Sequence, residues 1–311
     1  MKTFNHIPVM LNECIRGLDI KPDGIYVDCT LGGGGHSKEI ASRLTTGRLI
    51  AIDKDEDAIM AAAERLYGYK ERITIVHDDF KNFRHILDGL KIDKVDGILA
   101  DLGVSSYQID NEERGFSYIK DAPLDMRMDR SQYLSAFNVV NEYTVNELTK
   151  IIAAYGEERY ARKIAENIVQ YRENRSIRTT GQLAEIVEKS IPAKFRWKYG
   201  NPCKRTFQAI RIEVNGELEY LDAAITDMVN SLKSGGRMCV ITFHSLEDRI
   251  VKQRFKEFFT DCVCDKSLPQ CVCGKKREIK ILTPKPVTAG EEELGNNSRA
   301  ECAKLRIIEK I

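Results

Sequence analysis

The sequence IYVDCTLGGGGHS, at residues 25–37, says most about the fold of this chain. Residues 25–30 form a short apolar run that is typical of a buried β-strand, and residues 36–44 have a helical pattern. The glycines between them let the backbone approach a ligand closely, and the first turn of the helix offers free N–H donors. We therefore predict a strand, a glycine turn that binds a ligand, and a helix. A tight turn without a ligand is the alternative.

Similar apolar runs follow at residues 48–53, 73–77 and 95–101, with an alanine-rich helical segment at 55–67. Short strands that alternate with helices indicate a parallel sheet that is covered on both faces. The strand pattern returns later in the chain, at 235–243, 278–282 and 303–308. The predicted fold class is therefore α/β.

A helical insertion interrupts this pattern. From about residue 106 to residue 214 no comparable strand is found, and helical spacing occurs at 144–155, 157–174 and 179–190. Thr144 and either Thr179 or Thr180 are candidate N-caps. We expect one domain formed by residues 1–105 and 214–311, with an inserted helical domain at 106–213. Residues 284–300 are expected to form a long surface loop.

The composition is that of an ordinary globular protein. Of 311 residues, 42% are hydrophobic and 31% are charged, and no apolar run approaches the ~20 residues of a membrane helix. The N-terminus lacks the apolar segment of a signal peptide, so we expect a cytoplasmic protein with no membrane partner. With 48 Lys and Arg against 47 Asp and Glu, the net charge of +1 argues against a globally basic nucleic-acid binder, although it can hide a local patch.

The residues at the ends of the second and third predicted strands are typical of a nucleoside site. Asp53 ends the second strand, where an acid can accept both hydroxyl groups of a ribose. Phe80 follows the third strand, where its ring could lie against an adenine; an ordinary core phenylalanine is the alternative. A dinucleotide fingerprint requires a glycine at its sixth position, which Ser37 or Lys38 occupies here. This pattern predicts an adenosine pocket and argues against an NAD-dependent dehydrogenase.

Asp101 ends the fourth strand, within ADLGVSS at residues 100–106. Ligands of open α/β sheets bind beyond the carboxyl ends of the strands, so Asp101 is expected to face the same crevice as Gly34 and Asp53. Its carboxylate can accept a hydrogen bond from an amine. That amine is either the nucleophile of a substrate or an amino group of the cofactor.

The chain resembles the RsmH (MraW) family over its whole length. Members of this family are S-adenosylmethionine-dependent methyltransferases that modify cytidine N4 in 16S ribosomal RNA. The resemblance rests on long motifs in one order: HIPVM at 6–10, DCTLGGGGHS at 28–37, DLGVSS at 101–106, RGFS at 114–117, PLDMRMD at 123–129, TFQAIRI at 206–212, FHSLEDR at 243–249 and AKLR at 303–306. It implies a class I methyltransferase fold, a Rossmann-like and mostly parallel seven-stranded sheet with an inserted helical domain.

The resemblance also implies a substrate and a cofactor. The substrate would be a cytidine in the decoding region of 16S rRNA, in the small ribosomal subunit, and the cofactor would be S-adenosylmethionine. The implied cofactor contacts are Gly34, Gly35, His36, Asp53, Phe80, Asp101 and Gln108. A non-enzymatic RNA-binding or ribosome-assembly factor with a nucleotide pocket is the alternative. The sequence does not give the oligomeric state, and a homodimer is one possibility.

Two residues are candidates for the chemistry. Asp101 is the first, because a hydrogen bond from the cytidine amine to its carboxylate would favour the nucleophilic geometry of N4. His244, at the carboxyl end of the strand expected at 235–243, is the second. A structural histidine is the alternative for His244.

A basic segment lies within the insertion. Residues 156–211 contain 13 Lys and Arg against 6 Asp and Glu, a local charge of +7. Cations can follow phosphates while the aromatic rings between them stack on unpaired bases, although a charge run is more often a solvated face. The candidate RNA-binding residues are Lys194, Arg196, Trp197, Lys198, Lys204 and Arg205.

Nine cysteines, an odd number, in a chain without a signal peptide indicate reduced thiols. Four of them form two close pairs, Cys262 with Cys264 and Cys271 with Cys273. Four thiolates could bind zinc tetrahedrally. The C-x-C spacing is tighter than the usual C-x2-C, so four thiols without a metal are an equal alternative.

Overall fold

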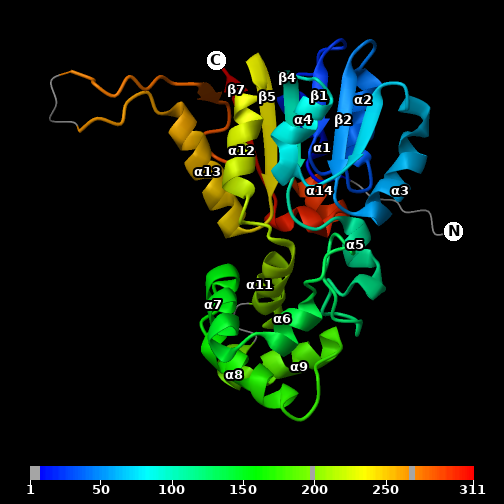
Figure 1. Ribbon diagram of the computed structural model, residues 1–311, viewed down its shortest axis with the longest axis vertical. Coiled ribbons are helices and arrows are strands. Elements are labelled where there is room, and N and C mark those ends of the chain that lie inside the picture. The colour runs from blue at the N-terminus through cyan, green and yellow to red at the C-terminus, as the bar shows by residue number, and fades with distance from the viewer. Residues whose placement is uncertain (1–7, 197–199, 266–269) are drawn as a thin grey trace. The chain divides into compact units, whose positions relative to one another are not determined.

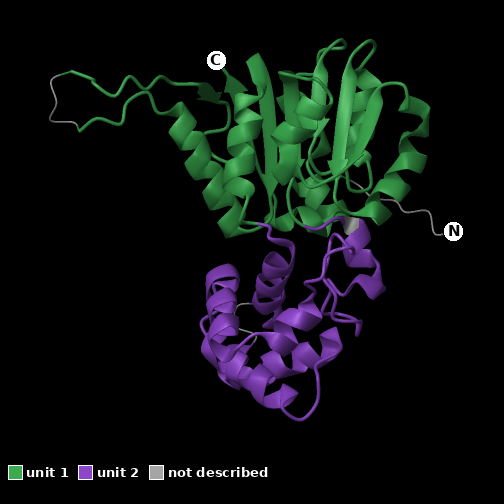
Figure 2. Cartoon of the chain, in the orientation of Figure 1, with its two compact units in different colours: residues 1–103, 218–311 green, residues 104–217 purple. Residues whose placement is uncertain are grey.

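The structure, a computed structural model, describes residues 8–196, 200–265 and 270–311. The chain forms two compact units, Met1–Gly103 with Leu218–Ile311, and Val104–Glu217 (Figure 2). The expected domain boundaries were 105/106 and 213/214. Each unit is described by itself below.

The first unit contains one mostly parallel sheet (Figure 1). In the part of the chain that the structure describes, the sheet has seven strands in the order β3-β2-β1-β4-β5-β7-β6. β7 runs antiparallel to its neighbours β5 and β6, and the other described strand pairs are parallel. The strands are β1 Ile25–Asp28, β2 Arg48–Asp53, β3 Ile73–His77, β4 Val95–Asp101, β5 Leu232–Thr242, β6 Ile279–Ile281 and β7 Lys304–Lys310. The predicted α/β class and the sheet are confirmed.

Helices cover both faces of this sheet. Consecutive side chains of a strand point to opposite faces, so Ile98 packs in one apolar layer and Leu99 in the other. The first layer includes residues of α4 Phe83–Gly89, α12 Leu221–Asn230 and α13 Ser245–Phe259. The other face is covered by α1 Leu11–Leu18, α2 Gly35–Arg43 and α3 Glu56–Leu66. Single-turn 3-10 helices follow α3 and β3, at Tyr67–Tyr69 and Phe80–Asn82.

The second unit is helical and has its own apolar core. Thr144 and Thr179 cap their helices as predicted, each accepting a hydrogen bond from the N–H three residues later. Four helices of this unit, α5, α6, α10 and α11, lie outside the segments predicted to be helical. The helices are α5 Ser106–Asp110, α6 Ala136–Glu142, α7 Val145–Gly156, α8 Ala161–Arg172, α9 Thr180–Ser190, α10 Ala193–Arg196 and α11 Cys203–Asn215, with a 3-10 turn at Glu112–Arg114.

The expectation of a loop at 284–300 was wrong in its second half. α14 Glu291–Asn296 and a 3-10 helix at Ser298–Cys302 lie there. The carboxylate of Glu293 accepts a hydrogen bond from the backbone N–H of Met10 at 2.7 Å. This contact joins residues far apart in sequence, so local composition carried no signal of it. Within the described ranges no helix is long and apolar enough to cross a membrane.

Candidate cofactor site

The carboxyl ends of β1, β2 and β4 meet at one edge of the sheet. β1 pairs with both β2 and β4, so the direction of strand addition reverses at β1 (Figure 1). A crevice outside the strand ends at such a reversal is where open α/β sheets bind ligands. The fold therefore places the glycine turn after β1 between Asp53 of β2 and Asp101 of β4.

The glycine turn is shaped by backbone requirements that side chains would violate. Gly32 and Gly34 have φ angles of 47° and 73°, in the left-handed region that favours glycine. A Cβ on Gly35 would come within 2.2 Å of Pro8 Cγ. At Gly33, by contrast, the nearest atom to an added Cβ would be Arg65 Nη1 at 3.8 Å. The turn is closely packed at Gly35 and more open at Gly33.

Asp53 ties the end of β2 to this turn. Its Oδ2 accepts a hydrogen bond from the Gly32 N–H at 2.7 Å, and its Oδ1 accepts one from the Asp55 N–H at 2.9 Å. Burial raises the pKa of Asp53 to about 6 despite these two bonds. The carboxyl group is thus held in place, and two hydroxyl donors of a ribose would favour its ionised form.

Asp101 has an unpaired oxygen. Among the residues that the structure describes, its buried Oδ1 has no hydrogen-bond partner, while Oδ2 lies 3.7 Å from His36 Nδ1. Burial, and then the negative charges of Asp28 and Glu247, raise the pKa of Asp101 well above its usual range. A buried acceptor left unpaired costs roughly 1–3 kcal/mol, which a donor on a ligand would recover. The site therefore fits a ligand that carries an amino group.

Several residues that hold Asp101 in place were not identified from the sequence. The Thr30 hydroxyl accepts a hydrogen bond from the Asp101 backbone N–H at 2.7 Å. Asp28, fully buried, accepts hydrogen bonds from the Ser37 hydroxyl at 2.6 Å and the Thr30 N–H at 3.1 Å. Burial raises the pKa of Asp28 to about 6. Asp28 and Thr30 lie in the motif around the glycine turn, and that position was the available signal.

His36 is buried behind the turn. Its Nε2 lies 3.0 Å from the carbonyl oxygen of Val9, and its Nδ1 faces Asp101. With Nε2 donating to that carbonyl, Nδ1 of the neutral ring carries no proton and lies 3.7 Å from Asp101 Oδ2. The structure thus brings four of the predicted cofactor residues together in one unit: Gly34, Gly35, His36 and Asp101. Asp53 is linked to this group because its carboxylate accepts the hydrogen bond from the Gly32 N–H.

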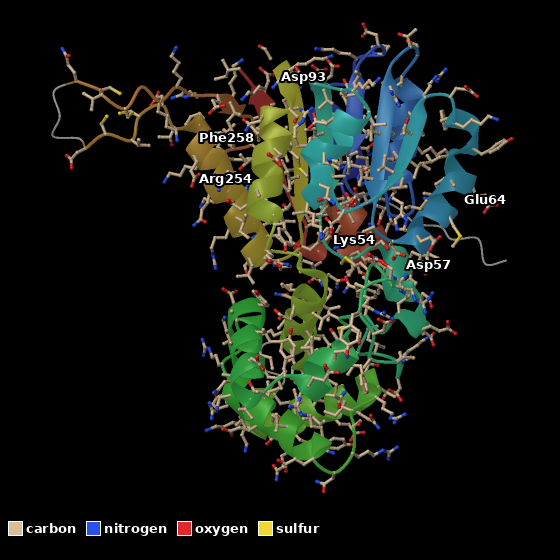
Figure 3. The ribbon with its side chains drawn as sticks, viewed as in Figure 1. Lys54, Asp57, Glu64, Asp93, Arg254 and Phe258 are labelled. Atoms are coloured by element: carbon tan, nitrogen blue, oxygen red, sulfur yellow. The ribbon has the colours of Figure 1, made fainter. Side chains whose placement is uncertain are left out.

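Phe80 and Gln108 have structural roles here, and their contact with a cofactor stays a prediction. Phe80 is half-buried and packs against the apolar layer that contains α4. Beside it, Asp79 forms an ion pair with Lys54, at 3.2 Å and at the carboxyl end of β2 (Figure 3). Gln108 belongs to the second unit, where its side chain closes a capping box with Ser105 at the start of α5.

His244 caps α13. Its Nδ1 accepts a hydrogen bond from the Glu247 N–H at 3.4 Å, and its Nε2 lies 3.1 Å from Glu247 Oε1. Glu247 in turn accepts a hydrogen bond from the Phe243 N–H at 2.8 Å. The His244 side chain is only 7% exposed. The cap gives His244 a structural role, while its buried Nε2 has no hydrogen-bond partner among the described residues. A catalytic role for His244 stays a prediction.

Two of the candidate RNA-binding residues, Arg196 and Arg205, line a pocket in the second unit. The cavity has a volume of about 130 Å³, and its lining also includes Glu158, Arg159, Tyr160 and Phe195. Lys194 and Lys204 are exposed. Trp197 and Lys198 lie outside the described residues. The pocket combines guanidinium groups with two aromatic rings, as a site for an unpaired nucleotide would.

A sheet of this strand order, with an antiparallel β7 beside β5, is that of class I S-adenosylmethionine-dependent methyltransferases. The chain belongs to the MraW methylase family, whose model matches residues 3–311. The resemblance is confirmed: the protein is a methyltransferase, and S-adenosylmethionine is its methyl donor. The dehydrogenase alternative is thereby set aside.

Curated relatives match almost the full length. The Ribosomal RNA small subunit methyltransferase H of Clostridium botulinum (strain Kyoto / Type A2) is 59% identical over 309 residues, which is 99% of both chains. The protein of the same name from Clostridioides difficile (strain 630) is 54% identical, again over 99% of both. Among solved structures, an rRNA methylase from Streptococcus thermophilus has a TM-score of 0.44 and 11% identity, covering 99% of each chain.

Proposed function

We propose that this methyltransferase acts on small-subunit ribosomal RNA and methylates the exocyclic N4 of a cytidine in the decoding region of 16S rRNA. The curated relatives, which are 54–59% identical to this chain, are named as methyltransferases of small-subunit ribosomal RNA. The observation that carries the choice of an amine is the buried, unpaired Oδ1 of Asp101 at the strand edge; it has no partner in the described part of the chain.

The chain's own residues bind and orient the reactants. S-adenosylmethionine, when bound, supplies a methyl group on a sulfonium, which is already strongly electrophilic. Asp53, which already holds the turn through the Gly32 N–H, would accept hydrogen bonds from the ribose hydroxyls. Asp101 would accept a hydrogen bond from an amine, either the amino group of the cofactor or N4 of the cytidine. In the reaction the amine attacks the methyl carbon and displaces the sulfonium sulfur. The protein mainly aligns these groups, and alignment can supply a large part of the rate enhancement.

The RNA is expected to bind through the basic insertion. The cytidine amine is occupied by base pairing in a helix, so the base must be unpaired or turned out of its stack before it reacts. The pocket lined by Arg159, Tyr160, Phe195, Arg196 and Arg205 offers rings and cations suited to such a single-stranded segment. The small ribosomal subunit is the proposed partner. A homodimer stays a prediction, which light scattering of the purified protein checks.

The test is a methyl-transfer assay on small ribosomal subunits from a strain that lacks the gene. The purified protein is incubated with tritiated S-adenosylmethionine, and the labelled RNA is digested and mapped. We expect label in N4-methylcytidine at one position, with free 16S rRNA as the parallel substrate. Label in another base, or on another atom of cytidine, would overturn the N4 proposal. Transfer to large-subunit RNA alone would overturn the choice of substrate.

A further inference from the structure

An arm of the first unit carries the four clustered cysteines. It comprises residues 260–265, which follow α13, and residues 270–278, which precede β6, and these two segments run side by side away from the sheet (Figure 1). Cys262, Cys271 and Cys273 are exposed, and Cys264 is half-buried. None of the cofactor-site contacts given above involves a described residue of this arm, so the cysteines require a separate explanation.

The four sulfur atoms converge on one point. The Sγ–Sγ distances are 3.5 Å for Cys262–Cys271, 3.5 Å for Cys271–Cys273, 3.9 Å for Cys264–Cys271 and 4.0 Å for Cys262–Cys273. All four sulfurs lie within 4.8 Å of one another. A tetrahedral site with Zn–S bonds of about 2.3 Å separates its sulfurs by about 3.8 Å. The arrangement has the dimensions of a four-thiolate zinc site.

We propose that Cys262, Cys264, Cys271 and Cys273 bind one zinc ion as thiolates and that this ion holds the arm together. Each thiol would lose its proton on binding, since the thiolate is the ligand. Four soft sulfur ligands in a tetrahedron select zinc or iron. An iron–sulfur cluster distributes its cysteines over several iron atoms, and sulfurs this close together fit a single ion better.

The backbone supports metal binding in a second way. The Cys264 N–H donates to Cys262 Sγ at 3.4 Å, the Val263 N–H to Cys273 Sγ at 3.5 Å, and the Val272 N–H to Cys264 Sγ at 3.3 Å. Hydrogen bonds from outer groups orient metal ligands and reduce the negative charge on them. The two C-x-C turns therefore direct all four sulfurs toward one point. Backbone N–H groups of each turn donate to a sulfur of the other turn. The C-x-C spacing is shorter than the usual C-x2-C, yet the structure shows that it is compatible with four sulfurs around one point.

Arg277 ties the base of the arm, donating to the Phe259 carbonyl and pairing with Asp261, each at 3.0 Å. Beyond these contacts, the described part of the arm that carries the cysteines has no apolar packing. Val263 and Val272, which lie between the paired cysteines, are 64% and 77% exposed, and no described residue from 261–265 or 270–276 belongs to an apolar core. Small segments without a core need a cross-link or a metal to hold one conformation. Two disulfides are the chemical alternative, but a disulfide requires about 2.05 Å between two sulfurs, whereas each sulfur here has several sulfur neighbours.

The test is the metal content of the full-length protein, purified without chelators under reducing conditions. We expect inductively coupled plasma mass spectrometry to find about one zinc ion per chain in the wild type. The double variant Cys262→Ser/Cys271→Ser should retain less than a tenth of this. Cys302→Ser, which removes an exposed cysteine outside the cluster, is the matched control and should keep the full equivalent. Cobalt substitution should give the absorption bands of a tetrahedral thiolate site.

Several results would overturn the proposal. The first is a wild-type protein that contains no zinc after incubation with zinc under reducing conditions. The second is one iron ion per chain instead of zinc. The third is the same zinc content in the wild type and the double variant. Binding of S-adenosylhomocysteine shows separately whether each variant is folded. Limited trypsin digestion gives a second measurement: chelation should speed cleavage after Lys275, Lys276 or Arg277 at least fivefold in the wild type. An unchanged cleavage rate would contradict a role of the metal in holding the arm.

Discussion

Asp101 combines three features that a catalytic or binding carboxylate needs. It ends β4, its backbone is held by Thr30, and one of its oxygens is buried without a partner among the described residues. Such an oxygen is costly in the ligand-free protein and becomes useful when a donor arrives. The raised pKa of Asp101 has the same origin, because burial disfavours its charged form.

Asp101→Asn is expected to lower kcat for methyl transfer by about 100-fold or more, because the amide presents a weaker acceptor and can turn its NH2 toward the amine. The measurement is the initial rate of tritium transfer, with the Kd of S-adenosylhomocysteine determined by calorimetry. A fall in kcat at unchanged Kd places the substrate amine at Asp101. A fall in kcat together with a rise in Kd places the amino group of the cofactor there.

Asp93→Asn is the matched control, since Asp93 is exposed and precedes β4 at the opposite end of the sheet (Figure 3). It should leave both kcat and Kd within twofold of the wild type. Undiminished turnover in the Asp101 variant would remove Asp101 from the chemistry.

The affinity for S-adenosylhomocysteine should depend on pH. The pKa of Asp53 is raised to about 6, so its carboxyl group is mostly protonated below pH 6. The ionised form is the one that accepts hydrogen bonds from both ribose hydroxyls, so Kd should rise as the pH falls through 6, by up to about tenfold per pH unit. Asp101, whose pKa is also raised, adds to the effect with the same sign.

Calorimetry between pH 5 and pH 8 checks this prediction, bracketing the Asp53 pKa of about 6. Asp53→Asn should weaken binding at neutral pH and flatten the profile. A Kd that is constant across this range in the wild type would show that neither carboxyl group must ionise for binding.

At the scale of elements, the N-terminus of α13 illustrates how a residue in a site motif can be structural. His244 accepts a hydrogen bond from the first turn of the helix, and Glu247 completes the capping box. His244→Ala should lower the free energy of unfolding by about 1 kcal/mol, whereas His244→Asn, which keeps a capping acceptor, should lower it by less. Chemical denaturation of both variants measures the difference.

The same pair of variants separates the two roles of His244. If His244 only caps α13, the Asn variant should retain kcat within a few-fold, since it restores the cap. A loss of kcat that is equal in the Ala and Asn variants, with the Asn variant as stable as the wild type, would identify the imidazole as a participant in the chemistry.

At the scale of the whole molecule, charge is unevenly distributed along the chain. The total is +1, but residues 156–211 carry +7, so the remainder carries −6. Replacing Lys194, Arg196 and Arg205 together by Gln should weaken RNA binding and reduce the slope of log K against log salt by about 2. Fluorescence anisotropy with a 16S rRNA fragment at several salt concentrations provides the measurement.

Replacing three exposed lysines of the first unit, Lys91, Lys252 and Lys256, changes the net charge equally and serves as the control. It should alter the slope by much less. Equal effects of the two triple variants, or an unchanged affinity after the first, would show that the basic segment makes no specific contact with RNA.

Features set by local sequence patterns were predictable. Alternating strands and helices, the glycine turn after residues 25–30 and the caps at Thr144 and Thr179 follow from the periodicity of apolar residues and from backbone preferences. The convergence of the residues after β1, β2 and β4 was also predictable, because parallel strands bring their carboxyl ends to one edge.

Other features depend on residues that meet only in the folded chain. Thr30 and Asp101 are 71 positions apart, and Glu293 lies 283 positions from Met10, yet these contacts hold Asp101 and anchor α14. The sequence could name Asp101, His244 and the four cysteines, but it could not show an unpaired oxygen, a helix cap or four converging sulfurs. Such properties belong to the spatial neighbours of an atom, and only tertiary packing brings those neighbours together.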